Sequence, residues 1–282
     1  MEFLSLDAQS VGKLLPKREV NTHKGDYGKI LLICGSRGYT GAAALCALGA
    51  LRSGAGLVYL AVPESIYEIE AVKLLEPVIL PMPDDGGMFA VQAVEKINAL
   101  LPQMDAVAIG PGLGRSEGTY QVVKNVLCYA KCPVVLDADG INVIAEHTHI
   151  LRDRIAPTIL TPHNGEFLRM NQQLSDDRCQ CAANAAGNLG CIMVLKGHKT
   201  VITDGRICYV NHTGNPGMAT GGSGDVLTGI ITSLIGQGID PLQAAACGAW
   251  LHGKAGDCCA QEIGEYGMLP QDMLQVLPRI IG

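Results

Sequence analysis

The residue types best suited to chemistry lie at positions 215–225, which read Asn-Pro-Gly-Met-Ala-Thr-Gly-Gly-Ser-Gly-Asp and run into a predicted helix. Backbone amides in a glycine cluster can turn toward a ligand because no Cβ stands in the way. The free N–H groups and the positive dipole end of a helix favour an anion there. An anion cradle beside a carboxylate suits phosphoryl transfer, which needs positioning, charge neutralisation and one base. The alternative is that Asp225 only caps the helix, as acids in first helical turns commonly do.

Polar and glycine-rich segments also follow five apolar runs that read as strands. These segments are 35–42, 110–114, 137–142, 161–166 and 196–200. Ligands of parallel α/β sheets gather beyond the carboxyl ends of the strands. Each segment alone could be an ordinary turn between a strand and a helix, but their joint placement predicts one site at one edge of a sheet.

The elements that must position these residues alternate along the chain. Continuous apolar runs predict buried strands at 29–34, 57–62, 106–109, 134–136, 158–160 and 192–195, and helical patterns fall at 41–52, 91–101, 119–130 and 175–189. This alternation predicts an α/β fold with a mostly parallel sheet and helices on both faces. Near the end of the chain we expect a hairpin (201–203 and 207–210) and helices at 225–237 and 241–260.

No linker or internal repeat divides the chain, so residues 1–282 are predicted to form one domain. The segment 81–87 is expected to be a loop. The Ala-rich stretch at 244–260 could belong to the core or to a subunit interface, and the sequence leaves both open.

Composition excludes several classes of function. The net charge is −6 and no long Lys/Arg run occurs, which argues against nucleic-acid binding. Apolar stretches are interrupted before the roughly 20 residues that a bilayer span needs, and the N-terminus lacks a secretory pattern. The eleven cysteines have no metal-ligand spacing and fit reduced, structural thiols of a cytoplasmic protein.

Two further patterns are weaker. His163 and Glu166 lie three residues apart with no third ligand, so a magnesium held through water at Glu166 is more plausible than a direct metal site. His252, in the apolar 244–260 stretch, reads as a core histidine. The P-loop pattern GxxxxGK[ST] is absent.

Taken in order, the motifs resemble those of ADP- or ATP-dependent NAD(P)H-hydrate dehydratases, a family of the ribokinase-like superfamily, over nearly the whole chain. The matching stretches are KGDYG at 24–28, GAA at 41–43, ALRSGAGLV at 50–58, GPGLG at 110–114, DAD at 137–139 with Asn142, TPH at 161–163 with GE at 165–166, LKG at 195–197 with Thr200, GNPGMA at 214–219 and GGSGDVLTG at 221–229. The resemblance implies a ribokinase-like three-layer α/β/α sandwich.

The resemblance also implies a reaction. The family repairs NADH or NADPH that has been hydrated at ring carbon 6: a nucleotide phosphorylates the ring hydroxyl, and loss of phosphate restores the dihydronicotinamide. Asp225 would take the hydroxyl proton, and amides of Gly222, Ser223 and Gly224 would stabilise the transferring group. Phosphate leaves far more readily than hydroxide, which explains the need for a nucleotide.

Binding residues follow from the same resemblance. Contacts to ADP or ATP are expected from Lys196, Gly197, His198, Lys199, Thr200 and Gly224, and contacts to the hydrated dinucleotide from Ala42, Gly112, His163 and Asp225. Mg²⁺ and a homotetramer are expected as well. The epimerase domain fused to many relatives has no room in 282 residues, so the chain is expected to act on the S epimer and to depend on a separate epimerase, or on spontaneous epimerisation, for the other.

Four positions depart from the family's usual residues. Ser223 replaces Thr and keeps the hydroxyl; Gly140-Ile141 replaces Ala-Leu; and Asn164 replaces Pro, which would loosen the loop that carries His163. Two other functions remain open at this point. One is a kinase of the same superfamily, acting on a vitamin precursor or a sugar, and the other is a nucleotide-binding regulator without catalysis, against which the intact Asp225 argues.

Overall fold

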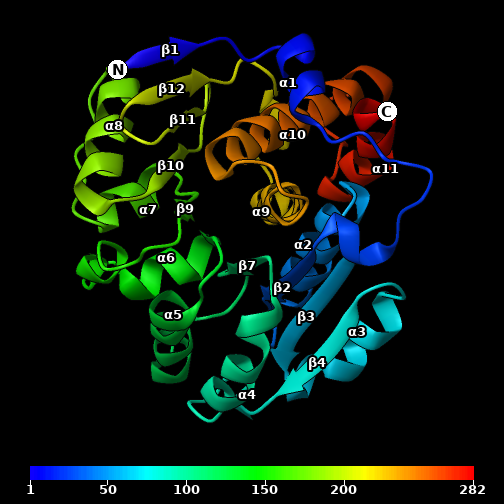
Figure 1. Ribbon diagram of the computed structural model, residues 1–282, viewed down its shortest axis with the longest axis vertical. Helices are drawn as coiled ribbons and strands as arrows, with labels where there is room; N and C mark the ends of the chain where they lie inside the picture. The colour runs from blue at the N-terminus through cyan, green and yellow to red at the C-terminus, as the bar shows by residue number, and fades with distance from the viewer.

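A ten-stranded sheet runs through the centre of the protein, whose computed structural model describes residues 1–282 (Figure 1). The strand order is β1-β12-β11-β10-β9-β8-β7-β2-β3-β4, and all neighbours are parallel except β11, which is antiparallel to both β10 and β12. The strands are β1 (Glu2–Leu4), β2 (Lys29–Ile33), β3 (Leu57–Pro63), β4 (Val78–Met82), β7 (Ala106–Ile109), β8 (Val134–Leu136), β9 (Thr158–Leu160), β10 (Ile192–Leu195), β11 (Val201–Thr203) and β12 (Ile207–Val210).

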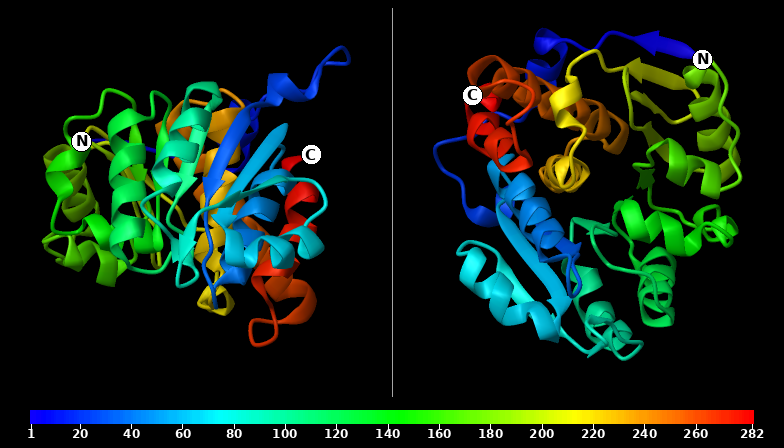
Figure 2. Two further views of the ribbon diagram at one scale, coloured as in Figure 1. Left: turned by 90° about the horizontal axis from the view of Figure 1, so that it is seen from below. Right: turned by 180° about the vertical axis from the view of Figure 1, so that it is seen from behind.

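Helices cover both faces of this sheet (Figure 2). They are α1 (Ala8–Leu14), α2 (Thr40–Arg52), α3 (Tyr67–Lys73), α4 (Ala93–Leu100), α5 (Glu117–Tyr129), α6 (Ala138–Ile144), α7 (Asn164–Arg169), α8 (Arg178–Leu189), α9 (Ser223–Gly236), α10 (Pro241–Ile263) and α11 (Pro270–Ile281). The predicted three-layer α/β architecture is confirmed. All six predicted strands, the hairpin and the six predicted helices are present, with ends shifted by at most three residues.

The inner strands of the sheet contribute to two separate cores. In β2, Ile30 and Leu32 pack on the side of α2, α9 and α10, whereas Leu31 and Ile33 pack on the side of α4 to α8. Successive side chains of a strand point to opposite faces, so a strand covered on both faces must be apolar at every position. This is why the strands read as continuous apolar runs in the sequence.

Several elements were missed or misjudged. The segment 81–87 is not simply a loop, because it completes β4 and enters the small hairpin β5 (Asp84–Asp85) and β6 (Met88–Phe89). Strands β1 and β4 are edge strands with exposed residues, which weakens the apolar signal. Helices α6 and α7 begin inside segments that were expected to be loops, and both are too short to show a helical period.

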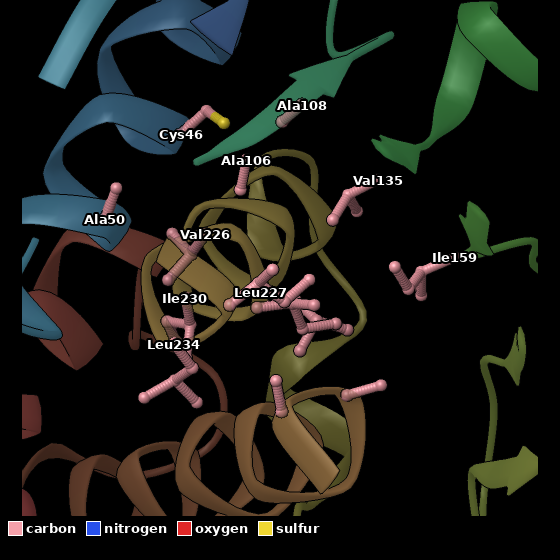
Figure 3. Close-up of a cluster of buried hydrophobic side chains, with 14 of the residues drawn as sticks. Cys46, Ala50, Ala106, Ala108, Val135, Ile159, Val226, Leu227, Ile230 and Leu234 are labelled. Atoms are coloured by element: carbon pink, nitrogen blue, oxygen red, sulfur yellow. The ribbon is translucent and has the colours of Figure 1, made fainter. Parts of the chain in front are cut away.

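Helix α9 is the structural axis of the site and is almost entirely buried. Figure 3 shows α9 end-on, with Val226 and Ile230 beside Cys46 and Ala50 of α2, and with the strand residue Ala106 above it. Small residues along α2 allow the two helices to approach closely: an ideal Cβ at Gly49 would lie 2.6 Å from the carbonyl oxygen of Val226. The sequence GGSGD is therefore attached to a helix that cannot move independently of the core.

The Ala-rich stretch at 244–260 belongs to α10 and is core, because α10 packs against α9 and α11. None of the helices is both long and apolar enough to cross a membrane. The eleven cysteines are all free thiols, six of them buried. The interpretation of the cysteines as structural thiols is consistent with this placement.

Glycine 229 tests the close approach of α2 and α9. A Cβ at Gly229 would overlap the carbonyl oxygen of Cys46, whereas a Cβ at the exposed helical Gly187 would meet nothing within 4 Å. We expect Gly229→Ala to lower the free energy of unfolding by about 1–3 kcal/mol, as overpacking does. Gly187→Ala should instead raise it by about 0.4–1 kcal/mol. Denaturant titration measures both, and equal effects of the two substitutions would contradict the packing described here.

Candidate active site

The anion cradle predicted at the start of α9 is present. Gly222 occupies the N-cap position with φ of 95°, a left-handed conformation that residues with a Cβ rarely adopt. Ser223 and Gly224 form the first helical turn, where backbone amides have no partner within the helix. The amide of Ser223 makes one long contact outside the helix, 3.4 Å to the carbonyl of Thr220. The dipole and free amides of a fourteen-residue helix thus converge on one point.

A cavity of about 950 Å³ opens beside this cradle. Its lining comes from the segment after β10, the loop between β12 and α9, the first turn of α9 and the middle of α10. All six residues expected to contact a nucleotide line it, namely Lys196, Gly197, His198, Lys199, Thr200 and Gly224, and so do His163 and Ser223. The structure therefore brings the sequence-predicted nucleotide residues together around one space.

The other predicted substrate residues lie outside this lining. Ala42, Gly112 and Asp225 are not among the residues that line the cavity. Ala42 and Gly112 lie against one another, since an ideal Cβ at Gly112 would be 2.8 Å from the Cβ of Ala42. They come from the segments after β2 and β7, which are neighbouring parallel strands. Ala42 and Gly112 therefore lie together, apart from the residues that line the cavity. His163, which was also expected to contact the dinucleotide, does line the cavity.

A buried ion pair lies beneath the cradle. The Lys196 ammonium donates to Asp137 Oδ1 at 2.8 Å, and the Thr228 hydroxyl of α9 donates to Asp137 Oδ2 at 2.6 Å. The Asp137 side chain is 1% exposed and that of Lys196 is 20% exposed. Burial alone would raise the pKa of Asp137, but the charge of Lys196 and its hydrogen bonds hold this pKa below the usual value. For Lys196, burial opposes the charged form, yet Asp137 and Glu166 raise its pKa.

This pair places a positive charge at the cradle. Lys196 Nζ would lie 3.3 Å from a Cβ at Gly224, so the ammonium is directly beside the first turn of α9. Asp137 directly follows β8. The next residue, Ala138, has a left-handed φ of 48°, a conformation that is strained for a residue with a side chain.

Asp225 has the properties of a general base. Burial raises its pKa to about 6, the negative charge of Asp137 adds to this shift, and Lys196 opposes it. A carboxylate with a pKa near 6 is mostly ionised at neutral pH and still accepts a proton readily. Asp225 is half-buried beside two other charged groups, which a role as a capping acid alone does not account for.

His163 and Glu166 lie at the start of α7, with His163 at the N-cap position and Glu166 in the first turn. Backbone amides of Gly165 and Glu166 donate to His163 Nδ1 at 2.9 and 3.3 Å, and the His163 amide donates to Glu166 Oε2 at 2.9 Å. Because Nδ1 accepts, the proton of the neutral ring belongs on Nε2, which lies 3.4 Å from Glu166 Oε1.

A magnesium site has to be judged from these carboxylates. No group of three or more His, Cys, Asp or Glu side chains is placed to hold a metal ion by itself. Mg²⁺ keeps several waters and relies on substrate phosphates, so one or two carboxylates suffice. Glu166 acts electrostatically on Lys196 at the cradle and offers the oxygen ligands that Mg²⁺ prefers, whereas both carboxylate oxygens of the buried Asp137 already accept hydrogen bonds from Lys196 and Thr228. The residues present fit a hydrated magnesium ion beside a bound polyphosphate.

Several residues that shape the site were missed by the sequence reasoning. Asp257 of α10 accepts from the Gly214 amide at 3.0 Å and from the Asn215 side chain at 3.2 Å, and so anchors the loop before the cradle. Asp257 could have been found as the single acidic residue within the apolar stretch 244–260. Thr228 left no signal, since a threonine in a buried helix is unremarkable in sequence.

His252 is buried, as predicted, but it also lines the cavity. Its Nε2 lies 3.3 Å from the Ser223 hydroxyl. Burial lowers its pKa to about 4, so the ring is neutral at physiological pH. The interpretation as a satisfied core histidine is therefore incomplete, because His252 also orients a residue of the cradle.

Comparison with known proteins gives a consistent result. Residues 30–279 match the family profile described as NAD(P)H-hydrate dehydratase. The chain is 44% identical over 274 residues to the bifunctional NAD(P)H-hydrate repair enzyme Nnr of Moorella thermoacetica, covering 95% of this chain and 52% of that protein. It is 37% identical over 279 residues to the ADP-dependent (S)-NAD(P)H-hydrate dehydratase of Bacillus subtilis, covering 96% of this chain and 95% of that one.

A solved structure agrees with these matches. The crystal structure of the ADP/ATP-dependent NAD(P)H-hydrate dehydratase of Bacillus subtilis, co-crystallised with ATP and Mg²⁺, superposes with a TM-score of 0.85 at 35% identity, covering 97% of this chain and 96% of that one. The ribokinase-like fold predicted from the motifs is confirmed by this likeness. The chain spans about half the length of the bifunctional relatives that it matches.

The ion pair of Lys196 and Asp137 can be tested through its effect on stability. Lys196→Met removes one partner and leaves the Asp137 carboxylate buried, which should lower the free energy of unfolding by about 3–5 kcal/mol at pH 7. Adding Asp137→Asn should recover most of this loss, because the amide carries no charge. The exposed Lys199, three residues away, serves as a control, and Lys199→Met should change stability by less than about 0.5 kcal/mol.

The pKa of Asp137 also determines how the free energy of unfolding depends on pH. The folded pKa of Asp137 is below the unfolded value of 3.8, so its contribution is present above that value and is lost as the pH falls through the folded pKa. Denaturant titrations of the three variants measure these effects. A stable Lys196→Met protein that the second substitution does not improve would contradict the assignment of a paired buried charge.

Proposed function

The chain belongs to the NAD(P)H-hydrate dehydratase family, and we propose that it performs the nucleotide-dependent dehydration of hydrated NADH and NADPH. The protein is then a hydro-lyase that repairs nicotinamide nucleotides, acting on the S epimer with ADP or ATP as co-substrate. Residues 1–282 act as one dehydratase domain in this proposal. The kinase alternative has less support, because the relatives that match nearly the whole chain carry the dehydratase name.

The observation that carries the proposal is the position of Asp225. It stands one residue beyond the amides of a helix-terminal anion cradle, next to a cavity lined by Lys196, and its pKa is about 6. A base at this point can serve a hydroxyl group that approaches a terminal phosphate held in the cradle. Carboxyl groups with perturbed pKa values cluster at functional sites.

The proposed reaction has two steps. The ring hydroxyl oxygen attacks the terminal phosphorus of the nucleotide, the bond from that phosphorus to the remaining nucleotide breaks, and Asp225 accepts the hydroxyl proton. Amides of Gly222, Ser223 and Gly224 and the ammonium of Lys196 stabilise the charge on the transferring group. The bond between carbon 6 and oxygen then breaks, phosphate leaves, and a proton lost from the adjacent ring carbon restores the double bond.

Magnesium would be held by Glu166, through water, and by the nucleotide phosphates, and when bound it would neutralise phosphate charge. The remaining work belongs to side chains of the protein. Asp137 and Thr228 keep the Lys196 ammonium at the cradle, and His252 holds the Ser223 hydroxyl. In the proposal, the hydrated dinucleotide contacts Ala42, Gly112, His163 and Asp225. The nucleotide contacts Lys196, Gly197, His198, Lys199, Thr200 and Gly224.

Location, epimerisation and subunit assembly complete the proposed function. We propose a cytoplasmic location, in keeping with eleven cysteines as free thiols. Epimerisation of the R epimer is assigned to a separate enzyme. A homotetramer is proposed on the resemblance to the family alone, and light scattering in solution tests this assembly.

The direct test of the function is a recovery assay. Purified protein is mixed with hydrated NADH, Mg²⁺ and either ADP or ATP, and the near-ultraviolet absorbance of the dihydronicotinamide is followed. Nucleotide-dependent recovery is expected, and the faster nucleotide identifies the donor. Lack of recovery with intact substrate would reject the dehydratase, and a stable phosphorylated product from a vitamin precursor or sugar would favour the kinase.

The pKa of Asp225 predicts the pH dependence of this activity. Below about pH 6 the carboxylate is protonated and cannot act as a base, so kcat/KM should fall about tenfold per pH unit there. Asp225→Asn should reduce turnover by at least about 10²-fold and leave nucleotide binding intact, because the amide keeps the shape and loses the base. The exposed Asp153 provides a control, Asp153→Asn. Near-normal turnover of Asp225→Asn would remove Asp225 from the mechanism.

A further inference from the structure

Arg178 connects two parts of the site that the sequence does not join. It is the first residue of α8, and its guanidinium donates three hydrogen bonds. Nη1 donates to Asn164 Oδ1 at 2.8 Å, and Nη2 donates to the carbonyls of Leu195 and Lys196, both at 3.1 Å. A planar guanidinium presents its donors in a fixed fork, so the three acceptors are held at defined relative positions.

The acceptors belong to the two loops that matter for the proposed reaction. Asn164 directly follows His163 and opens α7, whereas Leu195 and Lys196 end β10 and begin the nucleotide-lining segment. The guanidinium also lies against the next residue of that segment, since an ideal Cβ at Gly197 would be 3.1 Å from Nη2. One side chain therefore touches both loops.

The backbone alone links these loops only once in this region. The Lys196 amide donates to the carbonyl of Pro162 at 2.9 Å. One hydrogen bond leaves the relative orientation of two segments free, whereas the contacts made by Arg178 add further points of attachment. The side chain also keeps Nε buried without a hydrogen-bond partner, an energetic cost that native proteins usually avoid.

We propose that Arg178, through Asn164, is a positioning residue that fixes the nucleotide-lining segment relative to the His163 loop. This inference rests on the proposed function, in which the two loops hold the phosphoryl donor and acceptor. Asn164 thus replaces the rigidity of a proline at this position with a hydrogen bond to a remote helix. A misplacement of about 1 Å between reacting groups can cost about 10²-fold in rate.

The test compares variants of Arg178 and Asn164 with a matched control. Asn164→Ala removes one bond and leaves the carbonyls of Leu195 and Lys196 in contact with Arg178, and Arg178→Lys keeps the charge without the fork. The control is Arg154→Lys: Arg154 also donates to backbone carbonyls, those of Val126, Leu127, Ala130 and Cys132, but it precedes β9 and lies outside the cavity lining.

The expected result separates positioning from stability. Asn164→Ala and Arg178→Lys should lower kcat at least about tenfold with both substrates saturating. The nucleotide cleaved per NADH restored should rise above one, because water competes for a misplaced phosphoryl group. Calorimetric titration should show nucleotide affinity weakened at least about threefold by Arg178→Lys and unchanged by Asn164→Ala. Arg154→Lys should alter the melting temperature only.

Two outcomes would overturn the inference. One is that Asn164→Ala and Arg178→Lys both keep the wild-type kcat and cleave one nucleotide per NADH restored. The other is that Arg154→Lys changes kcat and this ratio by as much as they do. If the wild-type protein shows no turnover, the proposed function fails, and the nucleotide titrations then decide the inference separately. Equal nucleotide affinity of wild type and Arg178→Lys would reject it in that case.

Discussion

The site depends on one buried interaction, the ion pair of Lys196 with Asp137 that Thr228 completes. Its three members come from the end of β10, the end of β8 and the second turn of α9, so the pair fixes the central helix relative to two strands. Asp137 is buried, Lys196 is 20% exposed and lines the cavity, and the two groups hold each other ionised. The negative charge of Asp137 also contributes to the raised pKa of Asp225, and the ammonium stands beside the anion cradle. In the proposed reaction, the ion pair therefore sets the electrostatics of both the base and the phosphate site.

The fold supports this pair through the unusual burial of α9. A helix whose first turn binds a charged ligand is normally near the surface, but α9 passes through the centre of the protein with α2, α10 and the sheet around it (Figures 1 and 3). Close packing of the two helices requires small residues at the contact: Gly49 and Ala50 in α2, and Gly229 in α9. A rigid helix can preorganise amides and a carboxylate, which is how electrostatic catalysis acts.

The sequence was sufficient to predict the layers of the fold and the segments that line the cavity beside α9. Strands buried on both faces leave continuous apolar runs, and the segments after β8, β9 and β10 must meet because these strands are parallel neighbours. It was not sufficient for contacts between residues far apart in the chain. Thr228 and Asp137 are separated by 91 positions, and no local pattern links them. Asn164 was read as a departure that loosens its loop, whereas its side chain is bound by Arg178 from another helix.

The central claim is that the phosphoryl group passes to the ring hydroxyl and that its oxygen leaves with the phosphate. Hydrated NADH labelled with ¹⁸O at the ring hydroxyl tests this directly, with the released phosphate analysed by mass spectrometry. The account predicts one ¹⁸O atom in each phosphate that accompanies a restored NADH. Unlabelled phosphate, with the ¹⁸O recovered in water, would show that nucleotide cleavage and dehydration are separate events and would contradict the account.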